Sequence, residues 1–121
     1  MCVLQVRFTS PTGVAIPEER FFVTGVKACP PADVTAPVPS TARGDLEYFR
    51  ASAEGAGLDV TAAFRGRHCR VQIRAWSDVN ADGRLSSGDW SGTSAAETIE
   101  DQGMFGGNSV RAPDVALALV P

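Results

Sequence analysis

One short stretch of this 121-residue chain, residues 78–89, is rich in glycine and in oxygen-bearing side chains. It reads Asp-Val-Asn-Ala-Asp-Gly-Arg-Leu-Ser-Ser-Gly-Asp. Calcium is a hard cation that takes about six to eight oxygen ligands, and a loop of this length supplies them from positions 1, 3, 5, 7, 9 and 12. The pattern therefore predicts a calcium-binding loop, in which one residue uses its backbone carbonyl and the others use their side chains. The predicted ligands are Asp78, Asn80, Asp82, Arg84 (through its carbonyl), Ser86 and Asp89.

Two other residues of the loop agree with this interpretation. Gly83 falls where the chain must turn sharply with a positive φ, a conformation that only glycine adopts at little cost. Leu85 is expected to pack against the core beneath the loop. The alternative is a turn that binds no metal, but it would leave three carboxylates close together without a counter-ion. Because Asp89 is shorter than the usual Glu, the expected dissociation constant is moderate, about 10⁻⁶ to 10⁻³ M.

The elements around the loop are predicted from the alternation of apolar and polar residues, which is typical of half-buried strands. The sequence Arg65-Gly66-Arg67 between two such runs predicts a tight hairpin turn. The loop at 78–89 would begin directly after a strand. Regular strands are predicted at residues 4–8, 58–64, 69–76 and 115–119, and less regular strands at 20–26 and 46–51.

Two stretches lack this alternation. Residues 29–43 contain four prolines and are expected to form an extended surface loop. Residues 91–108 fit two alternatives. The segment Ser94-Ala95-Ala96-Glu97 has the spacing of a capping box, which would begin a helix near 95–102, whereas Thr98-Ile99 fits a strand.

The whole pattern predicts an all-β protein with a single domain, residues 1–121. About seven short strands separated by turns indicate an antiparallel β-sandwich, with an edge-closed barrel as the alternative. The formal net charge of −3 argues against a nucleic-acid partner, because no basic stripe is present to contact phosphates. No apolar run approaches the roughly 20 residues of a membrane-spanning helix.

The calcium loop resembles those of EF-hands and, more closely, of dockerins. The segment that enters it, residues 71–76, has a strand pattern and not that of an amphipathic helix. The order of elements is similar to that of transthyretin-like and Ig-like β-sandwich modules of bacterial envelope proteins and lipoproteins. It consists of a strand, then Asp-x-Asn-x-Asp-Gly, then a Gly-Asp pair, a further Gly and a final strand. The resemblance covers about residues 56–120, and the chain departs from it at Asp89 and in the insertion at 29–56. It implies a secreted or surface location and no enzymatic activity.

The three cysteines allow one disulfide. Cys29 and Cys69 are the favoured pair, which would leave Cys2 over. Near a mature N-terminus, Cys2 could carry the lipid anchor of a bacterial lipoprotein, the only membrane attachment that we expect. The alternative is that Cys2 and Cys69 both face inward as buried thiols.

The remaining candidates for chemistry are weaker. His68 is the only histidine, and neither zinc spacing nor a nucleophile-elbow motif occurs, so an enzyme is not expected. Trp76 and Trp90 flank the metal loop and could contact a carbohydrate, although packing is the more common role of aromatic residues.

These observations lead to one expected function and two alternatives. The expected function is a calcium-stabilised structural or adhesive module, without catalytic activity, that is extracellular or in the cell envelope and has lost a signal peptide. The first alternative is a calcium-dependent module that binds a carbohydrate or a cell-surface protein. The second is a fibre-forming subunit that self-associates through edge strands.

Overall fold

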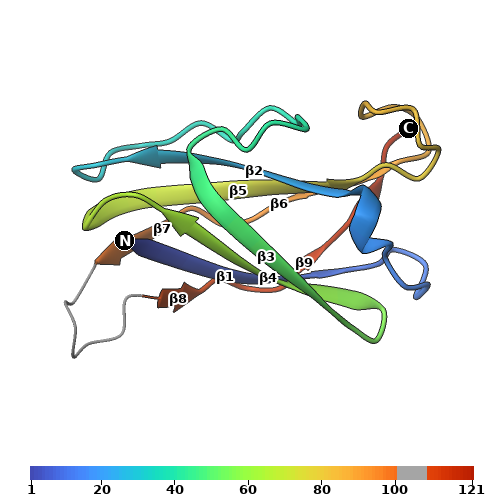
Figure 1. Ribbon diagram of the computed structural model, residues 1–121, viewed down its shortest axis with the longest axis horizontal. Helices are drawn as coiled ribbons and strands as arrows, with labels where there is room; N and C mark the ends of the chain where they lie inside the picture. Colours follow the sequence, from blue (N-terminus) through green and yellow to red (C-terminus); the bar gives the residue numbers. More distant parts are fainter. Residues whose placement is uncertain (101–108) are drawn as a thin grey trace.

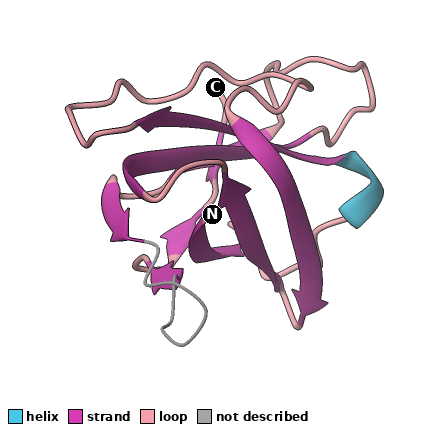
Figure 2. Ribbon diagram, turned by 60° about the vertical axis from the view of Figure 1, so that its left-hand side comes forward, coloured by secondary structure: helices cyan, strands magenta, loops and turns pink. Residues whose placement is uncertain are grey.

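The computed structural model describes residues 1–100 and 109–121 (Figure 1). Within this part of the chain the protein is all-β, and its strands form two sheets. The single helical element among the described residues is a 3₁₀ turn, η1 (Glu18–Arg20), which leads into the second strand (Figure 2). No described helix is long and apolar enough to cross a membrane.

The first sheet is built around the N-terminal strand. Its order is β3-β4-β1-β8, and β9 also pairs with β1. β1 and β4 run antiparallel from Cys2 opposite Phe64 to Thr9 opposite Gly57, whereas β8 and β9 run parallel to β1. The strands are β1 (Cys2–Thr9), β3 (Leu46–Glu54), β4 (Gly57–Phe64), β8 (Ser109–Arg111) and β9 (Val115–Ala116).

The second sheet is built around β5 and is antiparallel throughout. Its order is β10-β6-β5-β2, and β7 pairs with β5 beyond the end of β6. Between β9 and β10 the chain passes from one sheet to the other, and the backbone N–H of Leu117 donates to the carbonyl of Thr9 at 2.9 Å. The strands are β2 (Phe21–Ala28), β5 (His68–Ser77), β6 (Trp90–Thr93), β7 (Glu97–Glu100) and β10 (Ala118–Leu119).

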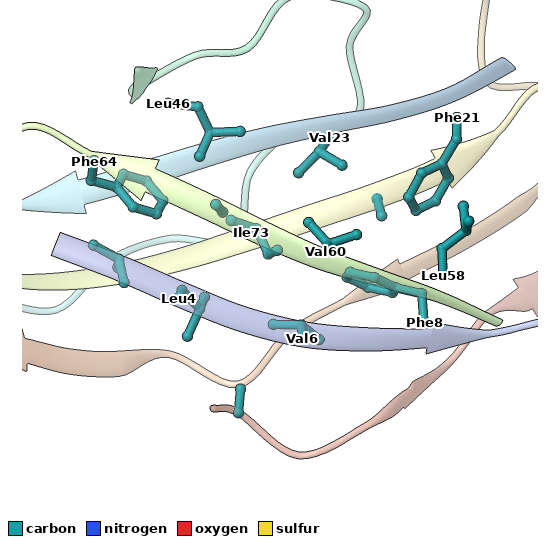
Figure 3. Packing of buried hydrophobic residues seen from close by; sticks show 14 of the residues in the cluster. Leu4, Val6, Phe8, Phe21, Val23, Leu46, Leu58, Val60, Phe64 and Ile73 are labelled. Atoms are coloured by element: carbon teal, nitrogen blue, oxygen red, sulfur yellow. The ribbon is translucent and has the colours of Figure 1, made fainter. Parts of the chain in front are cut away.

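One hydrophobic core lies between the two sheets (Figure 3). Alternate residues of β1 and β5 are buried, as the period of two predicts. The rings of Phe8 and Phe21 meet edge to face across the core, with centroids 5.9 Å apart. The labelled residues in Figure 3 point into this shared interior from both sheets: Leu4, Val6, Phe8, Leu46, Leu58, Val60 and Phe64 from the first, and Phe21, Val23 and Ile73 from the second.

Three details differ from the sequence predictions. The described residues form ten strands rather than about seven, because the predicted strand at 115–119 is divided between two sheets and short strands occur near the C-terminal end. The first sheet is mixed rather than antiparallel, because β8 and β9 return alongside β1 in its own direction. The hairpin predicted at Arg65-Gly66-Arg67 is wrong: β4 and β5 belong to different sheets, so this turn connects the sheets. The two-residue hairpin is at Gly55-Ala56, between β3 and β4.

The alternatives for residues 91–108 are decided in their described part. Residues 97–100 form β7, so the strand interpretation of Thr98-Ile99 holds. Ser94 does not cap a helix. Its hydroxyl accepts from the backbone N–H of Ile73 at 3.0 Å and donates to the carbonyl of Ala95 at 3.1 Å. The remainder of the predicted helix, at 101–102, lies outside the described residues.

The proline-rich segment covers the outer face of the second sheet (Figure 1). Phe22 and Trp76 are cross-strand neighbours on that face, with ring centroids 4.8 Å apart, and the indole N–H of Trp76 donates to the carbonyl of Ser40 at 3.1 Å. Beyond this segment, the backbone N–H of Asp45 donates to the carbonyl of Gly25 in β2 at 2.9 Å. The segment is therefore a packed cover and not only a surface loop, and it leaves Trp76 buried.

Candidate metal centre

The loop at 78–89 connects two neighbouring strands, β5 and β6. Asp78 follows the last residue of β5 and Asp89 precedes the first residue of β6, where Ser77 is paired with Trp90. This strand pairing brings the first and last carboxylates of the loop together. The backbone of Val120 also fixes the far end of the loop, because its N–H donates to the carbonyl of Asp89 at 2.8 Å and its carbonyl accepts from Gly88 at 2.9 Å.

Three carboxylates meet inside the loop. Asp78, Asp82 and Asp89 each place one oxygen so that the three lie within 4.8 Å of one another, close enough to hold one metal ion. Asp78 is only 4% exposed and Asp89 is fully buried, whereas Asp82 is exposed. The sequence therefore predicted the position of an acidic cluster that the fold assembles.

Backbone N–H groups of the loop orient the two buried carboxylates. Asp78 accepts from Gly83 at 2.8 Å and from Asp82 at 3.2 Å, and Gly83 has the positive φ, 80°, expected at the sharp turn. Asp89 accepts from Val79 at 2.9 Å and from Ser86 at 2.8 Å. The Ser86 hydroxyl also lies 3.3 Å from the same Asp89 oxygen as the Ser86 N–H. Each carboxylate still has at least one oxygen with a lone pair that accepts none of these bonds, so the arrangement leaves capacity for a cation.

The other predicted ligands lie around the same centre. The hydroxyl of Ser86 donates to Asp82 at 2.9 Å and accepts from the side-chain amide of Asn80 at 3.0 Å. The backbone N–H of Arg84 donates to Asp82 at 3.1 Å, and the Arg84 guanidinium lies 3.6 Å from the same carboxylate. The carbonyl of Arg84 accepts no hydrogen bond within the described part of the chain. Leu85 is half-buried but is not a member of the core cluster.

The electrostatics of the loop favour a cation. The backbone N–H of Arg84 lowers the pKa of Asp82, and the hydroxyl of Ser86 and the Arg84 charge act in the same direction. For the buried Asp78 and Asp89, the described residues provide no cationic side chain within ion-pair distance. Three carboxylates within 4.8 Å of one another repel each other when they carry charge, so a bound cation would offset the cost of this arrangement.

The cysteines occupy the opposite end of the molecule from this loop. Cys29 and Cys69 are joined in a disulfide, the pairing favoured from the sequence. Cys2 is fully buried in β1, where its thiol contacts the carbonyls of Gly66 at 3.3 Å and Ile99 at 3.5 Å. This burial argues against the predicted lipid anchor, because an acylated sulfur would require the start of β1 to leave the core. For Cys2 the buried-thiol alternative describes the structure.

The two tryptophans do not form a shared contact surface. Trp76 is 1% exposed on the outer side of the second sheet, beneath the proline-rich segment. Trp90 is paired with Ser77, the residue after Trp76 in β5. Because successive side chains of a strand point to opposite faces, the ring of Trp90 is on the inner side of the sheet, where it packs against the core. For Trp76 the packing alternative therefore describes the structure, and its burial argues against the possible ligand contact.

A cavity of about 290 Å³ lies beside the metal loop and was not expected from the sequence. It was missed because its walls come from the 12–17 segment, η1, the loop and β6, which no local pattern relates to one another. Residues that line it include Thr12, Val14, Pro17, Arg20, Val79 and Trp90.

Comparisons of this chain with protein-family models, with curated proteins and with solved structures find no match. The residues and geometry of the loop and of its surroundings are therefore the basis for assigning a function.

Proposed function

We propose that this protein is a calcium-stabilised structural or adhesive module of the cell surface or the extracellular space. The proposed fold type is a β-sandwich of the transthyretin-like or Ig-like kind. The observation that carries the proposal is the convergence of Asp78, Asp82 and Asp89 at the junction of β5 and β6, with two of the three carboxylates buried. A cation at this point would join two strands of one sheet.

Calcium fits the donor set better than other common metals. All of the candidate donors are oxygens from carboxylates, an amide, a hydroxyl and a carbonyl, whereas zinc sites in proteins usually contain histidine or cysteine. Magnesium requires a near-octahedral shell and retains several waters, which a loop with up to six donors of its own does not favour. A site of moderate affinity is filled where calcium is millimolar, so the proposal includes an extracellular location.

The metal is proposed to stabilise the fold and not to catalyse a reaction. His68, the only histidine, is exposed at the far end of β5 and lies 3.0 Å from the carboxylate of Glu100. A metal that binds only the folded chain raises its stability by mass action. The loop joins the paired strands β5 and β6, so the proposed role of the metal is that of a staple between them.

Direct binding tests the proposal. Calcium-depleted protein should bind one calcium in a calorimetric titration, and terbium should bind in its place with emission sensitised by Trp90, the residue after Asp89. The variant Asp89→Asn should lose both signals. Asp114→Asn, a change at an exposed carboxylate between β8 and β9, is the matched control and should retain them. Absence of calcium binding by the folded wild-type protein would refute the proposal.

A second candidate function is supported by the cavity beside the metal loop. A calcium-dependent binding module would use this cavity, with Trp90 in its wall, to contact a partner. In this alternative the metal stabilises one wall of a binding site in addition to the sheet.

A further inference from the structure

The cavity lies next to the metal loop, with η1, the loop and β6 in its walls. In the ribbon, η1 and the loop are at the same end of the molecule (Figure 1). Two apolar side chains in its wall are well exposed: Val14 is 62% exposed and Val79 is 44% exposed. Ligand sites are typically concave and mostly apolar, with a small number of polar groups that orient the ligand. Exposed apolar side chains around a cavity are consistent with such a site.

The cavity has few polar side chains in its wall, and only one of them, that of Arg20, carries a charge. Thr12 uses its hydroxyl locally, with Ser10 and with the backbone N–H of Val14, each at 3.4 Å. Arg20 is half-buried, and within the described part of the chain its guanidinium donates one hydrogen bond, to the carbonyl of Val79 at 3.3 Å. No carboxylate among the described residues forms an ion pair with Arg20. The wall therefore contains one positive charge without an acidic partner.

We propose that this cavity binds a small molecule with an apolar body and a single carboxylate. The apolar body would pack on Trp90, Pro17 and Val14, and the carboxylate would bind the guanidinium of Arg20, whose planar donors match its geometry. A sugar fits less well, because these walls offer few partners for its hydroxyls. A phosphate monoester fits less well too, since one arginine cannot satisfy its higher charge and its three oxygens. The volume of about 290 Å³ favours a compact ligand.

The cavity and the metal loop share structural connections. The backbone N–H of Val79 donates to Asp89 and its carbonyl accepts from Arg20, so Val79 links a candidate metal ligand to the charged group of the cavity. The backbone N–H of Asp78 also donates to the carbonyl of Arg20, at 2.9 Å. Calcium that fixes Asp78 and Asp89 would therefore fix two walls of the cavity. The carboxylate should bind more tightly with calcium, and by reciprocity it should raise calcium affinity by the same factor. This coupling, unlike the cavity itself, rests on the proposed function.

The first experiment tests the cavity. Straight-chain carboxylates from butanoate to decanoate and 4-phenylbutyrate would be titrated calorimetrically into the protein, with 4-phenylbutanol as the neutral counterpart. We expect at least one carboxylate to bind with a submillimolar dissociation constant and 4-phenylbutanol to bind at least tenfold more weakly than 4-phenylbutyrate. Arg20→Gln should abolish this preference for the acid, whereas Arg50→Gln, a change at an exposed arginine in β3, should preserve it. Lack of binding by every carboxylate, or an unchanged preference in folded Arg20→Gln, would overturn the proposal. Binding of a peptide through its C-terminal carboxylate, without binding of any of these small carboxylates, would also overturn the proposal.

The second experiment separates the cavity from the metal. Titrations in calcium and in EGTA should differ at least threefold in affinity for wild type, and the difference should be smaller for Asp78→Asn at the same calcium concentration. Binding in EGTA alone tests the cavity even if calcium does not bind, so the two proposals can fail independently. Equal affinity in calcium and in EGTA, with calcium shown to bind, would overturn the coupling. Amide NMR spectra of each variant would establish that it is folded before its titration is interpreted.

Discussion

Removal of one buried carboxylate from the loop provides the most direct test of calcium as a staple. Asp78→Asn keeps the shape of the side chain and one oxygen to accept from Gly83, but removes one of three negative charges. Any change in hydrogen bonding to the neighbouring N–H groups is present with and without calcium. The difference in stability between the two conditions therefore isolates the contribution of the metal.

The expected size of the effect follows from mass action. At a calcium concentration about 100 times the dissociation constant, one-site binding adds about 2.7 kcal/mol to the free energy of unfolding. Because affinity depends on the charge of the ligands, we expect Asp78→Asn to weaken binding about 100-fold, which leaves about 0.4 kcal/mol at the same calcium concentration. For a chain of this size 1 kcal/mol corresponds to about 4 °C in Tm. Calcium should therefore raise the Tm of wild type by about 11 °C and that of the variant by about 2 °C.

Thermal unfolding followed by circular dichroism, in calcium and in EGTA, measures both increments. Asp114→Asn should respond to calcium as wild type does, because its carboxylate is exposed and outside the loop. A calcium increment in Asp78→Asn equal to that of wild type would refute the assignment of Asp78 as a ligand. A wild-type Tm that does not change with calcium would refute the staple itself.

Three other predictions concern single residues. The hydroxyl of Ser77 is buried without a hydrogen-bond partner in the described part of the chain. Ser77→Ala should therefore leave the free energy of unfolding in urea unchanged or raise it by up to about 1 kcal/mol. A clear loss of stability would contradict this reasoning. A Cβ at Gly25 would lie 2.8 Å from the ring of Phe64, so Gly25→Ala should cost about 1–3 kcal/mol in the same assay. Gly13→Ala changes an open position and should not disturb packing, so its cost should be only the backbone strain of a positive φ, 79°. In EGTA, the side chain of Asp82 should titrate below its ordinary pKa of 3.8 by NMR, because the Arg84 N–H favours its charged form. Because the pKa is lower in the folded state, this stabilisation is present above pH 3.8 and is lost as the pH falls through the folded pKa. An Asp82 carboxyl that titrates above 3.8 would contradict the role of the Arg84 N–H.

The strands were predictable where one face is buried and the other is polar. The regions of β1, β4 and β5 were all predicted from the alternation of apolar residues, because burial of one face imposes a period of two on the sequence. The pairing of those strands was not predictable by the same means. The turn Arg65-Gly66-Arg67 could connect two neighbouring strands of one sheet or two strands of different sheets, and the chain reverses in both. Nothing in the local sequence indicates that it connects the two sheets.

The candidate site divides in the same way. The acidic cluster was predictable, because its residues lie within one short loop and their spacing alone indicates a shared centre. The burial of Trp76 was not predictable, since the carbonyl that accepts from its indole belongs to Ser40, far away in the sequence. The cavity with Arg20 and Trp90 in its wall was not predictable either, because its walls come from separate segments.

The position of β1 has a consequence for how the chain is made. This first strand pairs on one side with β4 and on the other with β8 and β9, whose residues lie between 109 and 116. During synthesis from the N-terminus, β1 would leave the ribosome long before the strands that cover its second edge. Such distant pairings slow folding, because the closure of long loops has an entropic cost before any contact is made. This edge of β1 therefore stays unpaired until residues 109–116 have been synthesised, so the sheet can be completed only after the whole stretch from β1 to β9 has left the ribosome.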